Sequence, residues 1–337
     1  MRCLAAGMIG LAVACAGPVA AQQVPAADPA AAQSPIRDLD TLVVSGVQPG
    51  PGMWKVSQGD HVLWLLGTVS PLPKKMQWQS RDVEGVIAQA QEVIAPPAVK
   101  IDARLGLFQQ LLLVPKTLGA RKNPNGETLQ QIVPADMYVR WRVLKHKYLG
   151  RDRGVEQWRP MFAAMELYQE AIEDTGLKPG GVVWPVVERA ARQHQVATTS
   201  TTVSIMIEDP KAALQEFRGT RLDDLDCFGK TLQRLESDLG TMRERANAWA
   251  IGDIAALQAL PYSDQNEACM RAATQAGVLR KRVGDIEAQV ERRWLSAAEQ
   301  ALMKNAVTFA SLPMRELLKP DGYLAKLQAK GYRVEAP

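Results

Sequence analysis

Residues 53–68, MWKVSQGDHVLWLLGT, decide the fold. MWKV and HVLWLLGT are rich in β-branched and aromatic residues, and the glycine-containing turn SQGD separates them. Two such runs around a short polar turn predict a β-hairpin. Ser80 then offers an N-cap for a helix, and the apolar run EVIA predicts a further strand that Pro96 ends. The domain therefore begins as β-β-α-β.

The middle of the chain carries helical periodicity. Over residues 102–195 the apolar side chains recur three or four positions apart, as in YVRWRVLKHKYL and FAAMELYQEAIE. The segment VATTSTTV, 196–203, is a strand candidate because β-branched residues dominate it. Long helices are expected over 209–249 and 252–302. Few strands and many helices follow from these patterns.

The carboxyl-terminal segment repeats the opening pattern. AVTFASL, 306–312, predicts a strand, and the turn PDG leads to a helix over 323–330. Gly331 ends that helix, and YRVE predicts a last strand. We expect an α/β fold, with a small central mixed β-sheet and many flanking helices, in one domain over 53–337. The alternative is two halves within this stretch. Because nothing in it resembles a linker, two such halves would be closely packed.

The first 52 residues read as a leader and a tether. Arg2 precedes the apolar run LAAGMIGLAVA, which is shorter than the roughly 20 apolar residues of a membrane span. We expect a signal peptide over 1–21, cleaved after Ala21, and a periplasmic or secreted protein with no membrane span after cleavage. Lipidation at Cys15 is the weaker alternative. Residues 22–52 are rich in Pro and Ala and predict a disordered linker.

Two cysteines remain beyond the leader, Cys227 and Cys269. An even number in an oxidising compartment predicts one disulfide, and two buried free thiols are the alternative. No second cysteine or histidine stands at the spacing of a zinc or CxxC site. The whole chain carries a net charge of +4 and no run of five like charges, so nucleic acid is not an expected partner.

Three segments resemble the TraB/GumN family: LWLLGTVSPLPKKMQW near the start, WAIGDIAAL in the middle, and LLKPDGYLAKLQAKGYRVEAP at the end. The resemblance spans most of residues 53–337 and is strongest to the GumN-like branch, which is named for a gene associated with exopolysaccharide clusters. The family includes bacterial secreted proteins and the animal Tiki metalloproteases, so the resemblance implies a Tiki-like α/β fold.

The resemblance also implies a site at the ends of the strands. In the family, a GTxH motif, acidic residues after the next strands and a GxxH motif near the carboxyl terminus can hold a divalent metal that activates water. The corresponding positions of this chain are Gly67, Thr68, Ser70, Pro96, Ser200 and Glu316. We expect the segments that carry them to converge at one sheet edge.

At these positions the chain departs from the family pattern. Ser70 stands for the first histidine, and its hydroxyl is a poor metal ligand. Pro96 and Ser200 stand for the acidic residues, and Glu316 stands for the last histidine. Gly67 permits a sharp turn and the Thr68 hydroxyl can bond to backbone, so neither needs a catalytic reason to persist. We therefore expect no metal, no cofactor and no catalytic residue.

Other candidate sites have ordinary structural explanations. His61, His146 and His194 lack the spacing of a metal-binding signature. No GxSxG motif is present, so Ser70 is not expected to be a nucleophile. Asp209 stands before a proline, which is typical of a helix N-cap.

Two functions compete at this stage. The first is a non-catalytic relative of metal-dependent hydrolases, a pseudoenzyme that binds an unidentified periplasmic protein or glycan partner. The second is an active hydrolase of peptides or glycan-linked substrates, with a site rebuilt around Glu316, Arg315 and Glu188. A link to exopolysaccharide production is compatible with both. The absence of several expected ligands favours the first.

Overall fold

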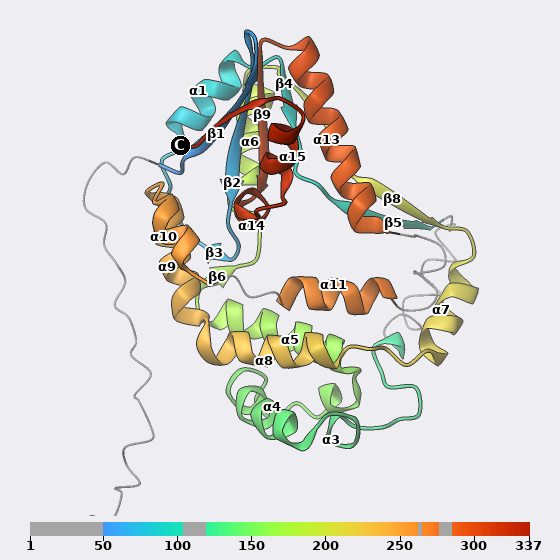
Figure 1. Cartoon of the computed structure of the whole chain (residues 1–337). Coiled ribbons are helices and arrows are strands. Elements are labelled where there is room, and N and C mark those ends of the chain that lie inside the picture. The colour runs from blue at the N-terminus through green and yellow to red at the C-terminus, as the bar shows by residue number, and fades with distance from the viewer. Residues whose placement is uncertain (1–49, 104–118, 262–264, 276–284) are drawn as a thin grey trace, which may run out of the picture. The chain divides into compact units, whose positions relative to one another are not determined.

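The structure, a computed structural model, describes residues 50–103, 119–261, 265–275 and 285–337. Its centre is a six-stranded sheet in the order β10-β1-β2-β9-β4-β7 (Figure 1). Strands β2, β9, β4 and β7 run parallel, while β1 is antiparallel to both β2 and β10. The strands are β1 (Met53–Gln58), β2 (His61–Thr68), β4 (Glu92–Ile94), β7 (Ala197–Thr199), β9 (Val307–Pro313) and β10 (Arg333–Glu335). The predicted α/β fold with a mixed sheet is confirmed.

The predicted hairpin is β1 and β2, in which Gln58 pairs with His61 across the turn. Gly59 in that turn has a φ of +58°, a conformation that glycine adopts without steric cost. The predicted last strand is β10, which pairs with β1 at the edge of the sheet. The two ends of the domain are therefore tied together by backbone hydrogen bonds.

Helices cover both faces of the sheet. Consecutive residues of β9, from Thr308 to Leu312, are buried although their side chains point alternately to opposite faces. The helix α13 (Ile286–Lys304) packs on β2, β4 and β9, and α1 (Arg81–Gln89) packs on β9 and on α6 (Trp184–Gln193). The short helices α14 (Met314–Leu318) and α15 (Tyr323–Ala329) follow β9.

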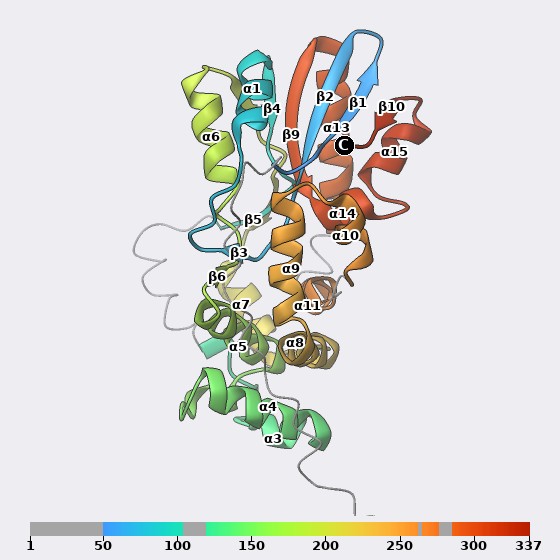
Figure 2. The same ribbon diagram turned by 90° about the vertical axis from the view of Figure 1, so that its left-hand side faces the viewer.

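A second core is entirely helical. The helices α5 (Pro160–Asp174) and α8 (Leu225–Ser237) pack side by side, and α4 (Ala135–Tyr148) contacts both (Figure 2). Trp141 and Phe228 are fully buried there with ring centroids 5.4 Å apart. The short α3 (Leu129–Ile132) closes this core. From α8 the chain continues into α9 (Leu239–Ala250), which returns to the sheet.

A small second sheet was not predicted, because the sequence around its strands was interpreted as helix and as one single strand. We predicted helix from residue 102 and one strand over 196–203, whereas β5 (Val99–Ala103) pairs in parallel with β8 (Val203–Ile207). The predicted single strand is divided, because Thr201 turns its hydroxyl to the carbonyls of Ala95 and Pro96 and separates β7 from β8. A further two-stranded sheet joins β3 (Leu72–Pro73) to β6 (Leu177–Lys178).

The two long helices predicted after residue 209 are interrupted, so their predicted extents are wrong. The first is α7 (Pro210–Gly219), α8 and α9, and the second includes α10 (Ile254–Ala259), α11 (Gln265–Gln275) and α13. Aspartates start several of these pieces. Asp209, Asp253 and Asp285 each accept a hydrogen bond from the backbone N–H three residues later. The predicted N-cap role of Asp209 is therefore confirmed.

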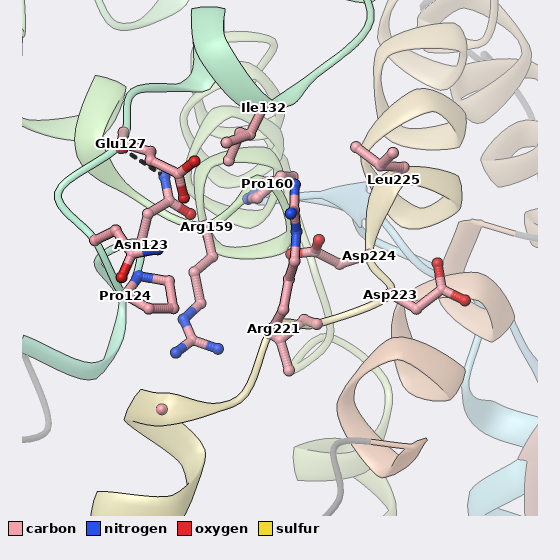
Figure 3. Close-up of a pocket in the computed structure, with 13 residues that line it drawn as sticks. Asn123, Pro124, Glu127, Ile132, Arg159, Pro160, Arg221, Asp223, Asp224 and Leu225 are labelled. Carbon is pink, nitrogen blue, oxygen red and sulfur yellow. Dashed lines mark hydrogen bonds between the residues drawn. The ribbon is translucent and has the colours of Figure 1, made fainter.

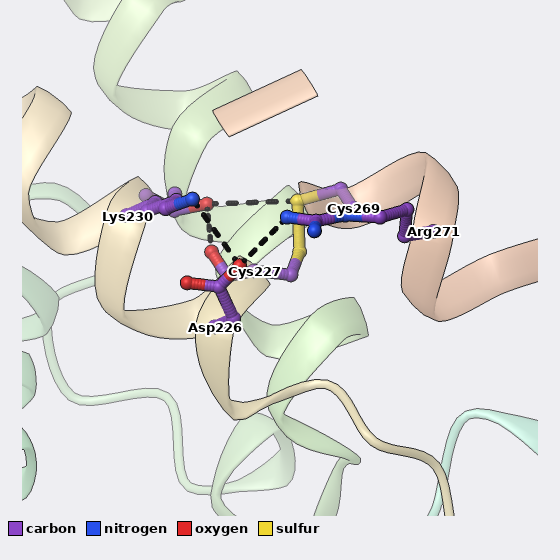
Figure 4. Close-up of polar contacts among 6 residues, drawn as sticks. Asp226, Cys227, Lys230, Cys269 and Arg271 are labelled. Atoms are coloured by element: carbon purple, nitrogen blue, oxygen red, sulfur yellow. Dashed lines mark hydrogen bonds and ion pairs between the residues drawn. A yellow bond between two sulfur atoms is a disulfide. The ribbon is translucent and has the colours of Figure 1, made fainter. Parts of the chain in front are cut away.

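The predicted disulfide is present. Cys227 on α8 and Cys269 on α11 are joined, at a sequence separation of 42 residues (Figure 4). Asp226 lies beside the bridge and pairs with Lys230 on its own helix and with Arg271 on α11. The disulfide and the Asp226–Arg271 ion pair therefore both join α8 to α11.

The predicted signal peptide, 1–21, and most of the predicted linker, 22–52, lie outside the described residues. Among the helices that the structure does describe, none has the length and apolar character needed to cross a membrane.

Candidate functional site at the strand ends

The carboxyl ends of four parallel strands lie together along one side of the sheet, the side at which these strands end. The pairing register places Leu65, Ala310, Ile94 and Thr199 in one row across β2, β9, β4 and β7. Because the four strands run in the same direction, the residues that follow this row all emerge at the same edge. We call it the strand-end edge.

The segments of the six candidate positions lie at this edge. Thr68 pairs with Pro313 where β2 and β9 end. Pro96 comes two residues after the end of β4, and Ser200 comes one residue after the end of β7. Glu316 belongs to α14, which begins directly after β9. Within the part of the chain that the structure describes, no hydrogen bond or ion pair joins the side chains of these six residues to one another.

Gly67 is closely packed against the side chains of α14. A Cβ atom at this position would lie 2.5 Å from Cε and 2.8 Å from Sδ of Met314, which is 1% exposed. The Gly67 carbonyl accepts a hydrogen bond of 2.6 Å from the indole N–H of the buried Trp249. The residue lies inside β2 with an ordinary φ, so the turn that we expected of it is wrong. Thr68 donates its hydroxyl to the Leu312 carbonyl at 3.2 Å, as expected.

Replacing Gly67 by alanine should destabilise the protein by about 1–3 kcal/mol, the usual range for overpacking a core. The end of the Met314 side chain must move, and neighbouring side chains leave it little room. Chemical unfolding measures the loss. Adding Met314→Ala to Gly67→Ala should cost less than the sum of the two single changes, because the shorter side chain removes the clash. Additive costs would contradict the packing explanation.

Local contacts already occupy the polar groups at Ser70 and Ser200. The Ser70 hydroxyl accepts a hydrogen bond from the Gly180 N–H at 3.2 Å. The Ser200 hydroxyl donates to Thr202 Oγ1 at 3.1 Å and accepts from the Thr202 N–H. Pro96 offers only its carbonyl, which the Thr201 hydroxyl approaches to 3.2 Å. These groups stabilise the loops that leave the strands.

Glu316 is the one carboxylate among the candidate positions. It lies 3.1 Å from Arg315 Nε and 3.4 Å from Lys319 Nζ, with its side chain 20% exposed. Burial raises the pKa of the nearby Tyr323 phenol, and the Glu316 charge adds to that rise. Glu188 pairs instead with Arg192 on its own helix, at 3.8 Å. The rebuilt hydrolase site would thus retain Arg315 and Glu316 as a pair.

This donor set does not fit a divalent metal. Such ions need several carboxylate, imidazole or thiolate ligands around one point. Ser70, Pro96 and Ser200 offer none of these groups, and two cations neutralise Glu316. In the described ranges, no three His, Cys, Asp or Glu side chains are grouped so that they could hold a metal. His61 instead bonds through Nδ1 to the Leu302 carbonyl.

A sequence model of the TraB/PrgY/gumN family matches residues 52–336, nearly the whole chain. The chain belongs to the TraB/PrgY/gumN family. Comparison with curated proteins and with solved structures gave no significant match. Family membership therefore rests on the whole domain, and the roles of the individual positions in this TraB/PrgY/gumN protein rest on the geometry described above.

Two residues at the strand-end edge of this TraB/PrgY/gumN protein were not expected there. Met314 covers Gly67, and Trp249 reaches from α9 to bond the Gly67 carbonyl while its ring lies 5.4 Å from that of Trp78. The motif WAIGDIAAL contains Trp249, and this was its only signal in the sequence. Periodicity predicts that such a tryptophan is buried, but not which strand it meets.

Proposed function

We propose that this protein is an exported, non-catalytic member of the TraB/PrgY/gumN family that acts by binding a protein or a glycan in the periplasm. The observation that carries the proposal is the occupation of the strand-end edge. Local contacts with Gly180, Thr202, Arg315 and Lys319 engage the side chains at Ser70, Ser200 and Glu316, and Pro96 has no donor atom in its side chain. The strand arrangement of the family is thus combined with side chains that are poor ligands for a metal.

Export is supported by two features. The leader-like residues 1–21 end in small side chains before Gln22, and the tether-like residues 22–52 follow. The Cys227–Cys269 disulfide suits an oxidising compartment. A link to exopolysaccharide production is the most specific part of the proposal, and it rests on the gumN name within the family.

The proposal is tested on the mature protein purified from the periplasm without chelator. We expect less than stoichiometric zinc, manganese or cobalt by elemental analysis, and no metal-dependent hydrolysis of peptides or polysaccharide. Stoichiometric metal would overturn the non-catalytic assignment. Hydrolysis that Glu316→Gln abolishes, and that the control Glu170→Gln at an exposed carboxylate of α5 preserves, would establish the hydrolase alternative in its place.

A variant that restores the family residues supplies the positive control. It carries Ser70→His, Pro96→Glu, Ser200→Glu and Glu316→His together. Because these positions follow neighbouring strand ends, the new side chains share one edge, and we expect the variant to bind cobalt measurably more tightly than the wild type. Equal cobalt binding by both proteins would contradict the assignment of these four positions to one site.

A further inference from the structure

A pocket of about 530 Å³ lies among the helices (Figure 3), and none of the six strand-end positions lines it. Four stretches of the chain contribute to its lining: residues 123–127, Ile132 of α3, Arg159 and Pro160 at the start of α5, and residues from Gly219 to Leu225 between α7 and α8. Its volume falls within the roughly 300–1,000 Å³ of small-molecule sites. The pocket can therefore hold a small organic ligand.

Arg159 fixes the walls of this pocket. Its side chain is 2% exposed, and its guanidinium stacks on Phe217 at 4.8 Å. Its N–H groups donate at 2.8–3.1 Å to four backbone carbonyls, those of Lys122, Phe217, Arg218 and Thr220. The bonds tie the end of α7 to the segment before α3. Because these N–H groups already donate to backbone carbonyls, a ligand in the pocket must form its hydrogen bonds with other residues.

Asp224 is the buried carboxylate of the pocket. The residue is 3% exposed, and Oδ2 accepts a hydrogen bond of 2.8 Å from the Met161 N–H at the start of α5. Burial raises the pKa of Asp224 to about 6, while the Met161 N–H and the Arg159 charge oppose the rise. An asparagine could cap the helix equally well without burying a charge. Capping alone therefore leaves the choice of a carboxylate unexplained.

Further oxygen atoms surround the same space. Asn123 is 7% exposed and uses both N–H groups of its amide, on the Glu127 and Trp158 carbonyls, at 2.9 and 3.0 Å. Its carbonyl Oδ1 makes no hydrogen bond among the described residues and is not sealed from the pocket. The Glu127 carboxylate lines the same side (Figure 3). With Asp224, three side chains offer acceptor oxygens.

Arg221 supplies the opposite charge. It lines the pocket together with Asp224, and within the described residues its side chain makes no hydrogen bond or ion pair (Figure 3). A guanidinium presents a planar pair of donors that matches a carboxylate or phosphate group. The pocket thus offers a cation for an anionic group and several acceptors for a cationic one.

We propose that this pocket binds a small organic zwitterion, whose primary ammonium group is held by Asp224 and whose anionic group pairs with Arg221, while Glu127 and Asn123 offer further acceptors on the facing wall. An ammonium group carries three N–H donors, and the ionised Asp224 carboxylate can accept from it. A bare metal ion would leave most of the volume empty, and the pocket side chains form no metal cluster in the described ranges. The proposal does not depend on whether the strand-end edge is catalytic.

The pH dependence of binding follows from the groups that face Asp224. The Arg159 guanidinium and the Met161 N–H favour its ionised form, and the Asp223 carboxylate opposes it. The charged side chains of Arg221 and Glu127 line the same pocket. An ammonium ligand needs the ionised carboxylate. Affinity should therefore rise as pH increases from 5 to 7, through the raised pKa of Asp224, and should lose this rise in Asp224→Asn.

Calorimetric titration of the full chain with ω-amino acids from glycine to 6-aminohexanoate tests the proposal. The series varies the distance between ammonium and carboxylate, and n-hexylamine and hexanoate are the probes with only one charge. We expect one ω-amino acid to bind best, with a loss of about 10- to 100-fold for either singly charged probe, as is typical of a lost charge-assisted hydrogen bond.

Variants locate the binding. Asp224→Asn should weaken the best ω-amino acid about 10-fold or more, and Arg221→Gln should weaken it while leaving n-hexylamine unchanged. The controls are Asp226→Asn, which alters an exposed carboxylate two residues away, and Arg189→Gln on α6. Far-ultraviolet circular dichroism checks that each variant is folded. Absence of binding by every probe, or equal binding by Asp224→Asn and Asp226→Asn, would overturn the proposal.

Discussion

Reducing the Cys227–Cys269 disulfide should lower the free energy of unfolding by about 4 kcal/mol, the value that the chain-entropy model gives for a loop of this length. The bridge joins α8 to α11, and in the described residues α11 otherwise depends mainly on its contact with α8. The unfolded chain gains freedom when the bridge is opened, whereas the folded chain keeps its packing. Urea unfolding with and without a reductant measures the difference.

The double variant Cys227→Ala, Cys269→Ala is the control for this experiment. It should be less stable than the oxidised wild type and indifferent to reductant, because it has no bridge to lose. Alanine suits position 227, which is fully buried. Equal unfolding midpoints for oxidised and reduced wild type would contradict the predicted contribution, and a reductant effect on the double variant would assign the change to another cause.

The ends of the domain could be predicted from the sequence because their signals are local. The hairpin of β1 and β2 follows from two β-rich runs around a turn, and the register of the parallel strands then brings Thr68, Pro96 and Ser200 to one edge. The cysteine count alone suggested the pairing of Cys227 with Cys269. In these cases few alternatives compete with the correct structure.

The middle of the domain could not be predicted in the same way. The pairing of β5 with β8 joins residues about a hundred positions apart, and a short apolar run fits a helix or a strand equally well. The breaks in the helices after residue 209 depend on capping aspartates such as Asp253 and Asp285, which periodicity does not detect. Tertiary contacts decide both outcomes.

The pocket had no signal in the sequence. It combines Asn123, Arg159 and Asp224, which are far apart in the chain and belong to no common motif. The function of Arg159 depends on backbone carbonyls, and any residue can supply a carbonyl. At the strand-end edge the reverse holds, because the GT pair and the strand pattern are visible before the structure is known. A sequence motif identifies side chains, whereas the walls of this pocket depend on the positions of backbone carbonyls, which the sequence does not reveal.

Arg159→Met should destabilise the protein by about 3–5 kcal/mol, the cost of removing one partner from a buried charged network. Methionine fills much of the space but donates no hydrogen bond, so the four carbonyls lose the donors that joined the end of α7 to the segment before α3. The carboxyl of Asp224 also loses a favourable charge, which should raise its pKa further. Thermal and urea unfolding measure the loss.

Arg159→Lys separates charge from geometry. Lysine keeps the positive charge near Asp224, but one ammonium group cannot reach carbonyls that the planar guanidinium reaches on several sides at once. We expect lysine to recover only a small part of the stability that methionine loses. Arg153→Met, at an exposed arginine directly before the short 3-10 helix Gly154–Gln157, should be close to neutral. Full recovery by lysine would show that charge alone explains Arg159, whereas its failure would show that the pocket walls depend on the directions of the guanidinium N–H groups.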